Sequence, residues 1–319
     1  MDPITHGALG AACAQALLHN KDKRNAWIVG GLAAMAPDLD ILISSQSDPM
    51  LSLLYHRNFT HSFIFIPIGG LFVALALRLF KRFRRHWRFT LFAALIGYAT
   101  HGLLDACTSY GTMLFWPFSD RRISWDIVSI IDPVVTIPLV LGVAWTVIHD
   151  DRRGVFYTLI FVGLFFLFNT FQHYRAITKM QTYLEQQHFQ IKRLRAFPYL
   201  ESSTLWRVTA EIDSHLYTAD VETSLTQPSR LKLVGAFPLF LPSHLPQSVR
   251  ESTSQMRDFT IFNWFCDGYV ILAQQQPLRL ADGRYLFNEN PTVSLWGIEF
   301  LPGARHVTPL SLIPLEATK

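Results

Sequence analysis

Nearly all of the long apolar runs in this 319-residue chain lie in its first half, between residues 1 and 172. A helix that crosses a bilayer needs about 20 mostly apolar residues. Four segments meet this requirement: residues 62–80, 89–107, 127–149 and 154–172. Residues 26–43 are apolar until they reach two aspartates, and residues 5–18 are short for a span, so they either cross a thinned region or pack against the other helices. The pattern predicts a polytopic transmembrane helical bundle with at least four spanning helices.

The second half, residues 173–319, has the pattern of an ordinary water-facing domain. Residues 173–196 predict a polar, amphipathic helix that leaves the membrane. After Pro198, alternating segments rich in aromatic and β-branched residues are typical of strands, with Pro and Gly marking the turns. The segments are 205–213, 215–225, 259–274, 283–289 and 293–301. We expect a small antiparallel sheet without a catalytic pattern, and we interpret this region as a lid or docking domain.

Composition agrees with this division. Hydrophobic residues make up 50% of the chain and charged residues only 16%, whereas a soluble domain is about 25% charged. The composition changes near residues 173–180, which predicts a mainly α domain at 1–172 and an α+β or β-rich extramembrane domain at 173–319. The net charge of +4 is spread over short loops, so we expect no nucleic-acid partner. Three distant cysteines predict neither a disulfide framework nor a thiolate zinc site.

Three short basic segments predict the orientation of the helices. Cytoplasmic loops are rich in Lys and Arg, and the strongest such loop is residues 81–88, followed by 21–24 and 150–153. With all three inside, the six apolar segments alternate without conflict. The N-terminus and the second domain then lie outside the cytoplasm. Arg121 and Arg122 fall outside against the rule, in a longer loop where we expect a local role for them.

Under this topology, the unusual polar residues of the first domain gather at the outer membrane face. They are His6, Asp38, Asp40, His56, Arg57, His61, His101, Asp105, Asp126 and Asp132. Ionisable groups at membrane depth are costly, so they are usually paired or functional. His101 and Asp105 are four residues apart, which places both on one helix face and suits two ligands of one metal. Imidazole and carboxylate together suit zinc, manganese or iron(II).

Each of these residues also has a plain structural interpretation. A lone histidine such as His6 often caps a helix, and His101 with Asp105 can form a simple hydrogen bond within one. Asp38 and Asp40 can end a helix, because a proline precedes them. The convergence of His and Asp from four separate segments on one face is harder to explain in this way. It predicts a metal site, with zinc as the first expectation.

Several motifs of the first domain, taken together, resemble a bacterial family. They are THGALG at 5–10, APDLD at 36–40, HRNFTHS at 56–62, HGLLDACTSYGT at 101–112, WPFSDRR at 116–122 and IDP at 131–133. This combination resembles the bacterial inner-membrane metal-dependent hydrolases, the YdjM-like, LexA-regulated group. Its His and Asp pattern is also similar to that of zinc-dependent phospholipase C. The resemblance implies residence in the bacterial inner membrane and marks as metal or catalytic candidates His6, Asp38, Asp40, His56, His61, His101 and Asp105.

We therefore expect a membrane-bound hydrolase that acts on a phosphoester or lipid-like substrate through a metal-activated water. In this hypothesis His61, His101 and Asp105 hold the metal with one of Asp38 or Asp40, and the other aspartate accepts a proton or binds a second metal. His6 and His56 are further candidate ligands. Three arginines are candidates for holding an anionic oxygen, since Arg suits two-point contact with phosphate: Arg57, Arg121 and Arg122.

Two other functions stay open. One is a membrane scaffold or stress protein with a structural metal, which would be coordinatively closed, whereas a catalytic site keeps a position for water. The other is an ion or proton transporter. Against transport, the polar residues cluster at one face and the two halves show no internal repeat of the transporter kind.

Overall fold

The computed structural model describes residues 1–286 and 294–311. The chain folds into two units. The first unit comprises residues 1–41, 56–174 and 198–204, and the second comprises 42–55, 175–197 and the chain from 205 onward. Two short segments thus cross the boundary expected from composition. Residues 42–55 fold with the second unit although they lie within the apolar half of the sequence.

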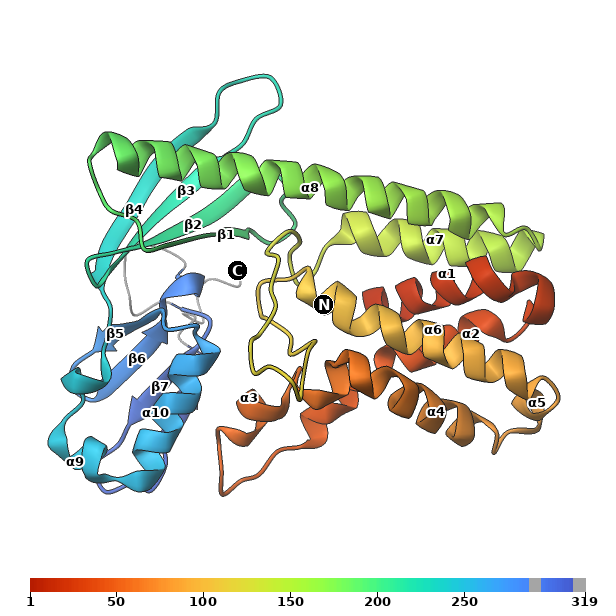
Figure 1. Cartoon of the computed structure of the whole chain (residues 1–319), viewed down its shortest axis with the longest axis horizontal. Coiled ribbons are helices and arrows are strands. Elements are labelled where there is room, and N and C mark those ends of the chain that lie inside the picture. Colours follow the sequence, from red (N-terminus) through yellow and green to blue (C-terminus); the bar gives the residue numbers. More distant parts are fainter. Residues whose placement is uncertain (287–293, 312–319) are drawn as a thin grey trace, which may run out of the picture. The chain divides into compact units, whose positions relative to one another are not determined.

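The first unit is helical (Figure 1). Its elements are α1 (Pro3–Asp22), α2 (Ala26–Met35), η1 (Pro37–Leu42), η2 (Phe59–His61), η3 (Phe63–Phe65), α4 (Ile66–Leu77), α5 (Lys81–Arg84), α6 (Trp87–Ala106), α7 (Pro133–His149) and the first part of α8 (Arg153–Gln186). Among the described residues, α6 and α8 are long and apolar enough to cross a membrane. Residues 51–61 and 63–77 add a third candidate if this pair, bent by 63°, is one span. The 17-residue α7 is apolar but shorter.

Three of the predicted helices are shorter than the apolar runs that predicted them. The helix expected at 62–80 is the 12-residue α4, which follows the 3₁₀-helix η3. The helix expected at 26–43 ends at Met35, and Pro37 begins the 3₁₀-helix η1. Proline cannot donate to a preceding turn and disfavours helix in the residue before it. The helix expected at 127–149 begins at Pro133, because Asp132 caps it by accepting a hydrogen bond from the Val134 N–H at 3.0 Å. Pro37 thus sets the C-terminal end of α2, and Asp132 sets the N-terminal end of α7.

Small residues let α1, α2 and α6 pack at close range. A Cβ added to Gly97 of α6 would lie 2.1 Å from the carbonyl oxygen of Gly30 in α2, and one on Gly10 of α1 would lie 2.5 Å from the same oxygen. Glycine and alanine at such crossings are typical of helix pairs in membranes, where van der Waals packing replaces the hydrophobic effect. This crossing brings the polar ends of the three helices together.

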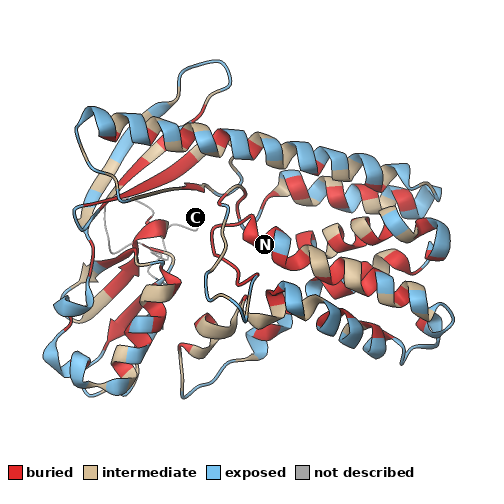
Figure 2. Ribbon diagram, viewed as in Figure 1, coloured by how far each residue is buried: buried red, intermediate tan, exposed pale blue. Residues whose placement is uncertain are grey.

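Large apolar side chains face outward on the helices at the edge of the unit. Phe72 of α4 is 66% exposed, Ile148 of α7 is 74% exposed and Leu167 of α8 is 67% exposed. Figure 2 shows exposed residues along the outer sides of these helices, whereas α1 and α2 carry many buried ones. An apolar surface of this extent marks a membrane or protein interface.

The last predicted span and the polar helix expected after it form one continuous helix, and the two units divide within it, between residues 174 and 175. Helix α8 runs without a break from Arg153 to Gln186, over 34 residues, so it is about 51 Å long at 1.5 Å per residue. The prediction of helix up to residue 196 is wrong, because the chain turns at His188, which has a left-handed φ of 61°. Residues Arg193–Pro198 then form strand β1.

The second unit holds two four-stranded sheets in place of the single small sheet expected. One has the order β1, β2 (Leu205–Ile212), β3 (His215–Glu222) and β4 (Arg230–Pro238). The other has the order β5 (Val270–Gln274), β6 (Leu278–Asp282), β7 (Gly297–Phe300) and β8 (Thr308–Leu310). The C-terminal part of α8 packs against the first sheet, with Ala176, Met180 and Leu184 in the same core as Trp206. Part of the predicted strand segments 283–289 and 293–301 lies outside the described residues.

The segment expected as a long strand at 259–274 is mostly helix. Helix α10 spans Thr253–Phe265, and only Val270–Gln274 are strand. Ser252 caps the helix by accepting a hydrogen bond from the Gln255 N–H at 3.3 Å. Its buried residues recur at helical spacing, and they include Asp258, Phe259, Phe262 and Phe265. The aromatic content predicted a strand, but the period of burial decides for a helix. The remaining elements are the short helices α3 (Leu51–Tyr55), η4 (Pro242–His244), α9 (Gln247–Glu251) and η5 (Gly283–Tyr285).

Candidate metal centre

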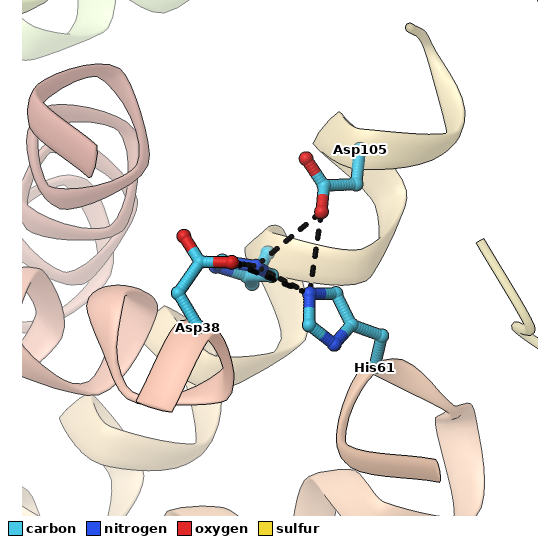
Figure 3. Close-up of side chains that lie close together, drawn as sticks. Asp38, His61 and Asp105 are labelled. Carbon is cyan, nitrogen blue, oxygen red and sulfur yellow. Dashed lines mark hydrogen bonds and ion pairs between the residues drawn. The ribbon is translucent and has the colours of Figure 1, made fainter. Parts of the chain in front are cut away.

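Four of the predicted residues meet in the first unit: Asp38, His61, His101 and Asp105. They come from η1, η2 and α6, and Figure 3 shows the Asp38, His61 and Asp105 side chains pointing toward one another. One ligand atom from each of the four residues lies within 4.8 Å of all the others. The side chains of His61, His101 and Asp105 are fully buried, whereas that of Asp38 is 21% exposed. Solvent therefore reaches the group from the side of Asp38.

Four of the six distances among these atoms match those of a tetrahedral metal site, and the two histidine Nε2 atoms are closer together, at 2.9 Å. The His61 Nε2 lies 3.6 Å from Asp38 Oδ1 and 3.3 Å from Asp105 Oδ2. The His101 Nε2 lies 3.4 Å from the same Asp38 oxygen and 3.5 Å from the same Asp105 oxygen. Ligand atoms about 2.0–2.2 Å from zinc at tetrahedral angles are about 3.3–3.6 Å apart. The geometry therefore fits one small divalent cation.

The two histidines are oriented by hydrogen bonds on their far sides. The His101 Nδ1 donates to the carbonyl oxygen of Ala34, and the His61 Nδ1 lies 3.3 Å from the Asp40 Oδ2. Both partners are acceptors, so each Nδ1 carries a proton and each ring turns its Nε2 toward the other three residues. These two Nε2 atoms face each other at 2.9 Å. Two lone pairs at this distance require a cation between or beside them, either a metal or an additional proton.

Asp105 is surrounded by cationic and hydrogen-bonding groups. Its Oδ1 contacts the amino group of Met1 and lies 3.0 Å from the His6 Nε2. Its Oδ2 lies 3.1 Å from the Arg57 Nε, but neither that oxygen nor that nitrogen has a hydrogen bond of good geometry among the described residues. A buried carboxylate oxygen without such a bond is costly. Asp105 Oδ2 thus has a free lone pair in the direction of the two histidines.

His6 lies beside the four-residue group and not in it. Its ring stacks on that of His101, with centroids 3.7 Å apart, and its Nε2 faces Asp105. The predicted ligand His6 is therefore placed to hold Asp105 and the His101 ring. The structure groups His6 with no set of ligand atoms that could share an ion, among the residues it describes.

Asp40 and His56 form the outer support of His61. The Asp40 Oδ1 accepts from the His56 Nδ1 at 2.8 Å, and its Oδ2 accepts from the backbone N–H of Arg57 at 3.0 Å and from the Thr60 hydroxyl at 2.8 Å. Asp38, Asp40 and His56 also lie close enough to hold an ion. Because Asp40 is already saturated with protein donors, its clearest role is to orient His61.

Local backbone features explain why these side chains meet. His101 and Asp105 are one turn apart on α6, and their position next to η2 depends on Gly102, where a Cβ would lie 2.4 Å from the carbonyl oxygen of His61. Arg57 has a left-handed φ of 61°, which turns the chain so that its own N–H faces Asp40. Sequence reasoning missed Thr60 and the Ala34 carbonyl. Thr60 stood inside the HRNFTHS motif, but a carbonyl leaves no sequence signal.

The three candidate arginines have different surroundings. The Arg57 side chain is 5% exposed, and it is committed to Asp105 and to the Thr108 hydroxyl at 3.0 Å. The guanidinium groups of Arg57 and Arg122 lie 4.6 and 4.8 Å from the centre of the Tyr110 ring. Arg121 is exposed. Arg57 is thus built into the centre, whereas Arg121 and Arg122 lie on the loop that follows α6.

A second His and Asp group lies in the second unit, at residues to which the sequence assigned no role: Asp48, Asp258 and His306. Arg257 donates to both Asp48 oxygens, at 2.9 and 3.1 Å, and approaches Asp258 at 3.4 Å. Its hydrogen bonds lower the pKa of Asp48. The His306 Nδ1 lies 2.9 Å from the buried Asp258 carboxylate. One protein cation, Arg257, thus offsets one of the two carboxylate charges of this group.

An apolar helical unit with His and Asp gathered at one set of helix ends defines a membrane protein with a candidate metal centre. The chain belongs to the YdjM inner membrane protein family, whose model matches residues 1–176 and so includes every residue of the centre. It is also similar to the inner membrane protein YbcI of Escherichia coli (strain K12). The two are 30% identical over 133 residues, which cover 40% of this chain and 75% of YbcI. No solved structure matches the chain.

Proposed function

We propose that this protein is a multi-pass inner-membrane hydrolase that uses one divalent metal held by His61, His101 and Asp105. The observation that carries the proposal is the pair of Nε2 atoms, 2.9 Å apart with both Nδ1 atoms committed to acceptors. Buried beside them is a carboxylate oxygen of Asp105 without a good hydrogen bond among the described residues. A metal ion satisfies all three atoms at once.

Asp38 is the member of the group that supports catalysis. Three protein ligands and one exchangeable position are typical of catalytic zinc sites, and Asp38 is the one partly exposed side chain of the four. A divalent metal held there supplies Lewis acidity and brings the pKa of water down to about 7. Asp38 is placed to accept the proton of that water, and Arg57 keeps Asp105 ionised as a ligand.

Zinc is the first candidate for the metal, with manganese and iron(II) as alternatives. Two imidazoles and one or two carboxylates suit all three ions. The buried charges balance only in part. Asp38, Asp40 and Asp105 bring three negative charges, whereas Arg57 and the amino group of Met1 bring two positive ones. These protein groups sum to a charge of −1, and a dication brings the sum to +1.

The membrane arrangement of the proposal follows the basic loops. Residues 21–24, 81–88 and 150–153 lie at the ends of helices opposite the metal centre, at the termini of α1, α4 with α5, and α7. Cytoplasmic placement of these loops puts the centre at the outer face of the inner membrane and the second unit outside the cytoplasm. A phosphoester or lipid-like substrate suits a centre at that depth, with Arg121 and Arg122 as contacts for an anionic group.

The first experiment measures metal content. Protein purified in mild detergent should hold about one equivalent of zinc, manganese or iron by elemental mass spectrometry. The His101→Ala, Asp105→Ala double variant should lose that metal while it keeps its helical circular dichroism. A screen of phosphoesters and phospholipids then tests hydrolysis. Wild-type protein without metal after attempted reconstitution would overturn the proposal.

A structural metal is the second candidate, because four protein donors can close a tetrahedral site. Asp38→Ala separates the two functions. In a hydrolase with three buried ligands, this variant keeps its metal and loses turnover. At a closed structural site, the same variant loses metal affinity and thermal stability together.

A further inference from the structure

An apolar groove runs along the helical unit between α1, α2 and α7. Its walls come from the first half of α1, nearly all of α2 and the second half of α7, and they include Ile4, Trp27, Leu32, Val140 and Val147. Its volume is about 620 Å³, which is within the range of ligand sites. Among the residues that the structure describes, no charged side chain lines it.

Small residues on two neighbouring helices make the groove hollow. Gly7 and Ala11 of α1 and Gly31 of α2 form its floor. A Cβ on Gly31 would lie 3.1 Å from the carbonyl oxygen of Gly7, so the two helices nearly touch beneath the groove. The larger side chains of α2 and α7 stand on either side. The hollow is therefore a result of helix packing and not of one missing side chain.

One end of the groove lies next to residues that contact the metal centre. Gly7 follows His6, which contacts Asp105, and Met35 follows Ala34, whose carbonyl holds the His101 ring. From there the groove continues along α2 to Trp27. From Met35 to Trp27 the helix rises over eight residues, which is about 12 Å. This length is close to one leaflet, which is half of a hydrocarbon core of about 30 Å.

We propose that this groove binds one hydrocarbon chain of a membrane lipid whose anionic head group lies at the metal centre. The inference rests on the proposed function, because it deepens the substrate class of the same site. Three observations select this occupant. The described lining of the groove is apolar, its length fits a chain in one leaflet, and its end lies one residue from His6 and from Ala34, which contact the centre where a bound divalent metal would attract negative charge. A phospholipid matches both features, because its phosphate suits the metal centre and its acyl chain, which lies within one leaflet, suits the groove.

The test uses full-length protein in vesicles that contain phosphatidylglycerol with a photoreactive diazirine in the middle of one acyl chain. After illumination, mass spectrometry of peptides locates the labelled residues. The groove variant is Val140→Trp, which fills the cleft. Its matched control is Leu141→Trp, the next residue on α7, which is 63% exposed and does not line the groove. Labelling of α1, α2 and α7 at groove residues should be lost in Val140→Trp and kept in Leu141→Trp.

Two results would overturn the inference. One is uniform labelling of exposed residues on α4 and α8, such as Phe72 and Leu167, with no excess in the groove. The other is cross-links that join two copies of the chain along α1 and α2, which would make the groove an interface between copies. Labelling does not require turnover. A labelled groove in protein that holds no metal would therefore contradict the proposed hydrolase and support the lipid site. Active protein that holds metal but shows no groove labelling would support the hydrolase and contradict the lipid site.

Discussion

The two units of this protein each contain a group of histidine and aspartate, and the groups differ in what neutralises them. In the second unit, Arg257 donates to Asp48 and approaches Asp258, so a protein cation already lies within the group. In the helical unit, the two Nε2 atoms of His61 and His101 face each other at 2.9 Å, a contact that requires a metal or an additional proton. Both groups place their ligand atoms close enough to hold an ion. The inward-facing pair of Nε2 atoms is the feature that favours the helical group as the metal site.

The two groups also differ in how their histidines are held. His306 makes its Nδ1 contact with Asp258 within the group itself. His61 and His101 use Nδ1 for partners outside the group, Asp40 and the Ala34 carbonyl, and turn Nε2 inward. This outer anchoring is typical of metal-binding histidines. Matched substitutions in the two groups can therefore test whether the metal site belongs to the helical group.

The largest difference should come from removing one histidine of each group. His61→Ala should abolish metal retention, because it removes a buried ligand. Any hydrolytic rate should then fall by about 10³-fold or more, because the metal no longer takes part in the reaction. His306→Ala should leave metal content unchanged. Elemental analysis of both variants beside wild type measures this directly. Equal metal loss in both, or in neither, would remove the distinction between the groups.

The next effect concerns the stability of the second unit. Asp258 is fully buried and accepts from His306, from the backbone N–H of Val307 at 3.1 Å and from Arg257. Asp258→Ala leaves these donors without an acceptor, so we expect a loss of about 2–3 kcal/mol. Thermal unfolding in detergent measures the change, and metal content should stay at the wild-type level. The Asn variant retains an acceptor and should lose less, and an equal loss in both would point to packing.

The apolar pattern predicted where the first unit is helical, because burial in or beside lipid requires continuous apolar residues. It could not place helix ends such as Met35, which Pro37 and local capping decide. It did predict helix on both sides of residue 172, but it placed the end of α8 at residue 196 and not at Gln186. In the second unit, the aromatic content around Phe259 and Phe262 favoured a strand, so the helical spacing of the buried residues of α10 was missed.

The meeting of four candidate site residues could be predicted from the sequence. Asp38, His61, His101 and Asp105 were all selected by residue type and by the expectation that helix ends meet at one face, and the structure brings them together. The sequence could not separate ligands from supporting residues, because Asp38 and Asp40 differ only in which way η1 points each one. Nor could it show that Arg57 is buried against Asp105, since that follows from its left-handed backbone.

A smaller effect should follow from weakening the outer support of His61. Asp40→Asn keeps the shape of the side chain but removes the charge that favours the Nδ1–H form of His61. Loss of such a partner costs about 10–100-fold in metal affinity. Competition with a chelator of known affinity measures the change. The matched control is Asp48→Asn, which should leave affinity unchanged; an unaltered affinity in Asp40→Asn would mean that the Thr60 hydroxyl, 3.0 Å from the His61 Nδ1, is sufficient.

The smallest expected effect is the contribution of the Asp48 charge to stability. The hydrogen bond from Arg257 is the main cause that lowers the pKa of Asp48 in the folded protein. A lowered folded-state pKa stabilises above the unfolded value of about 3.9, and the gain is lost as the pH falls through the folded-state value. Because the Arg257 side chain is 40% exposed, solvent screening limits the gain to about 0.5 kcal/mol.

Asp48→Asn therefore should lower the melting temperature slightly at pH 7, and the difference from wild type should shrink as the pH falls below the unfolded value of about 3.9 and vanish below the folded-state pKa, where Asp48 is protonated in both states. The asparagine still accepts from the Met50 N–H, which the aspartate accepts at 3.1 Å, so the variant isolates the charge from the turn. Melting curves of both proteins across this pH range provide the measurement. A difference that persists unchanged at low pH would show that Asp48 acts through the shape of the segment before α3, and that Arg257 contributes no charge neutralisation to the group.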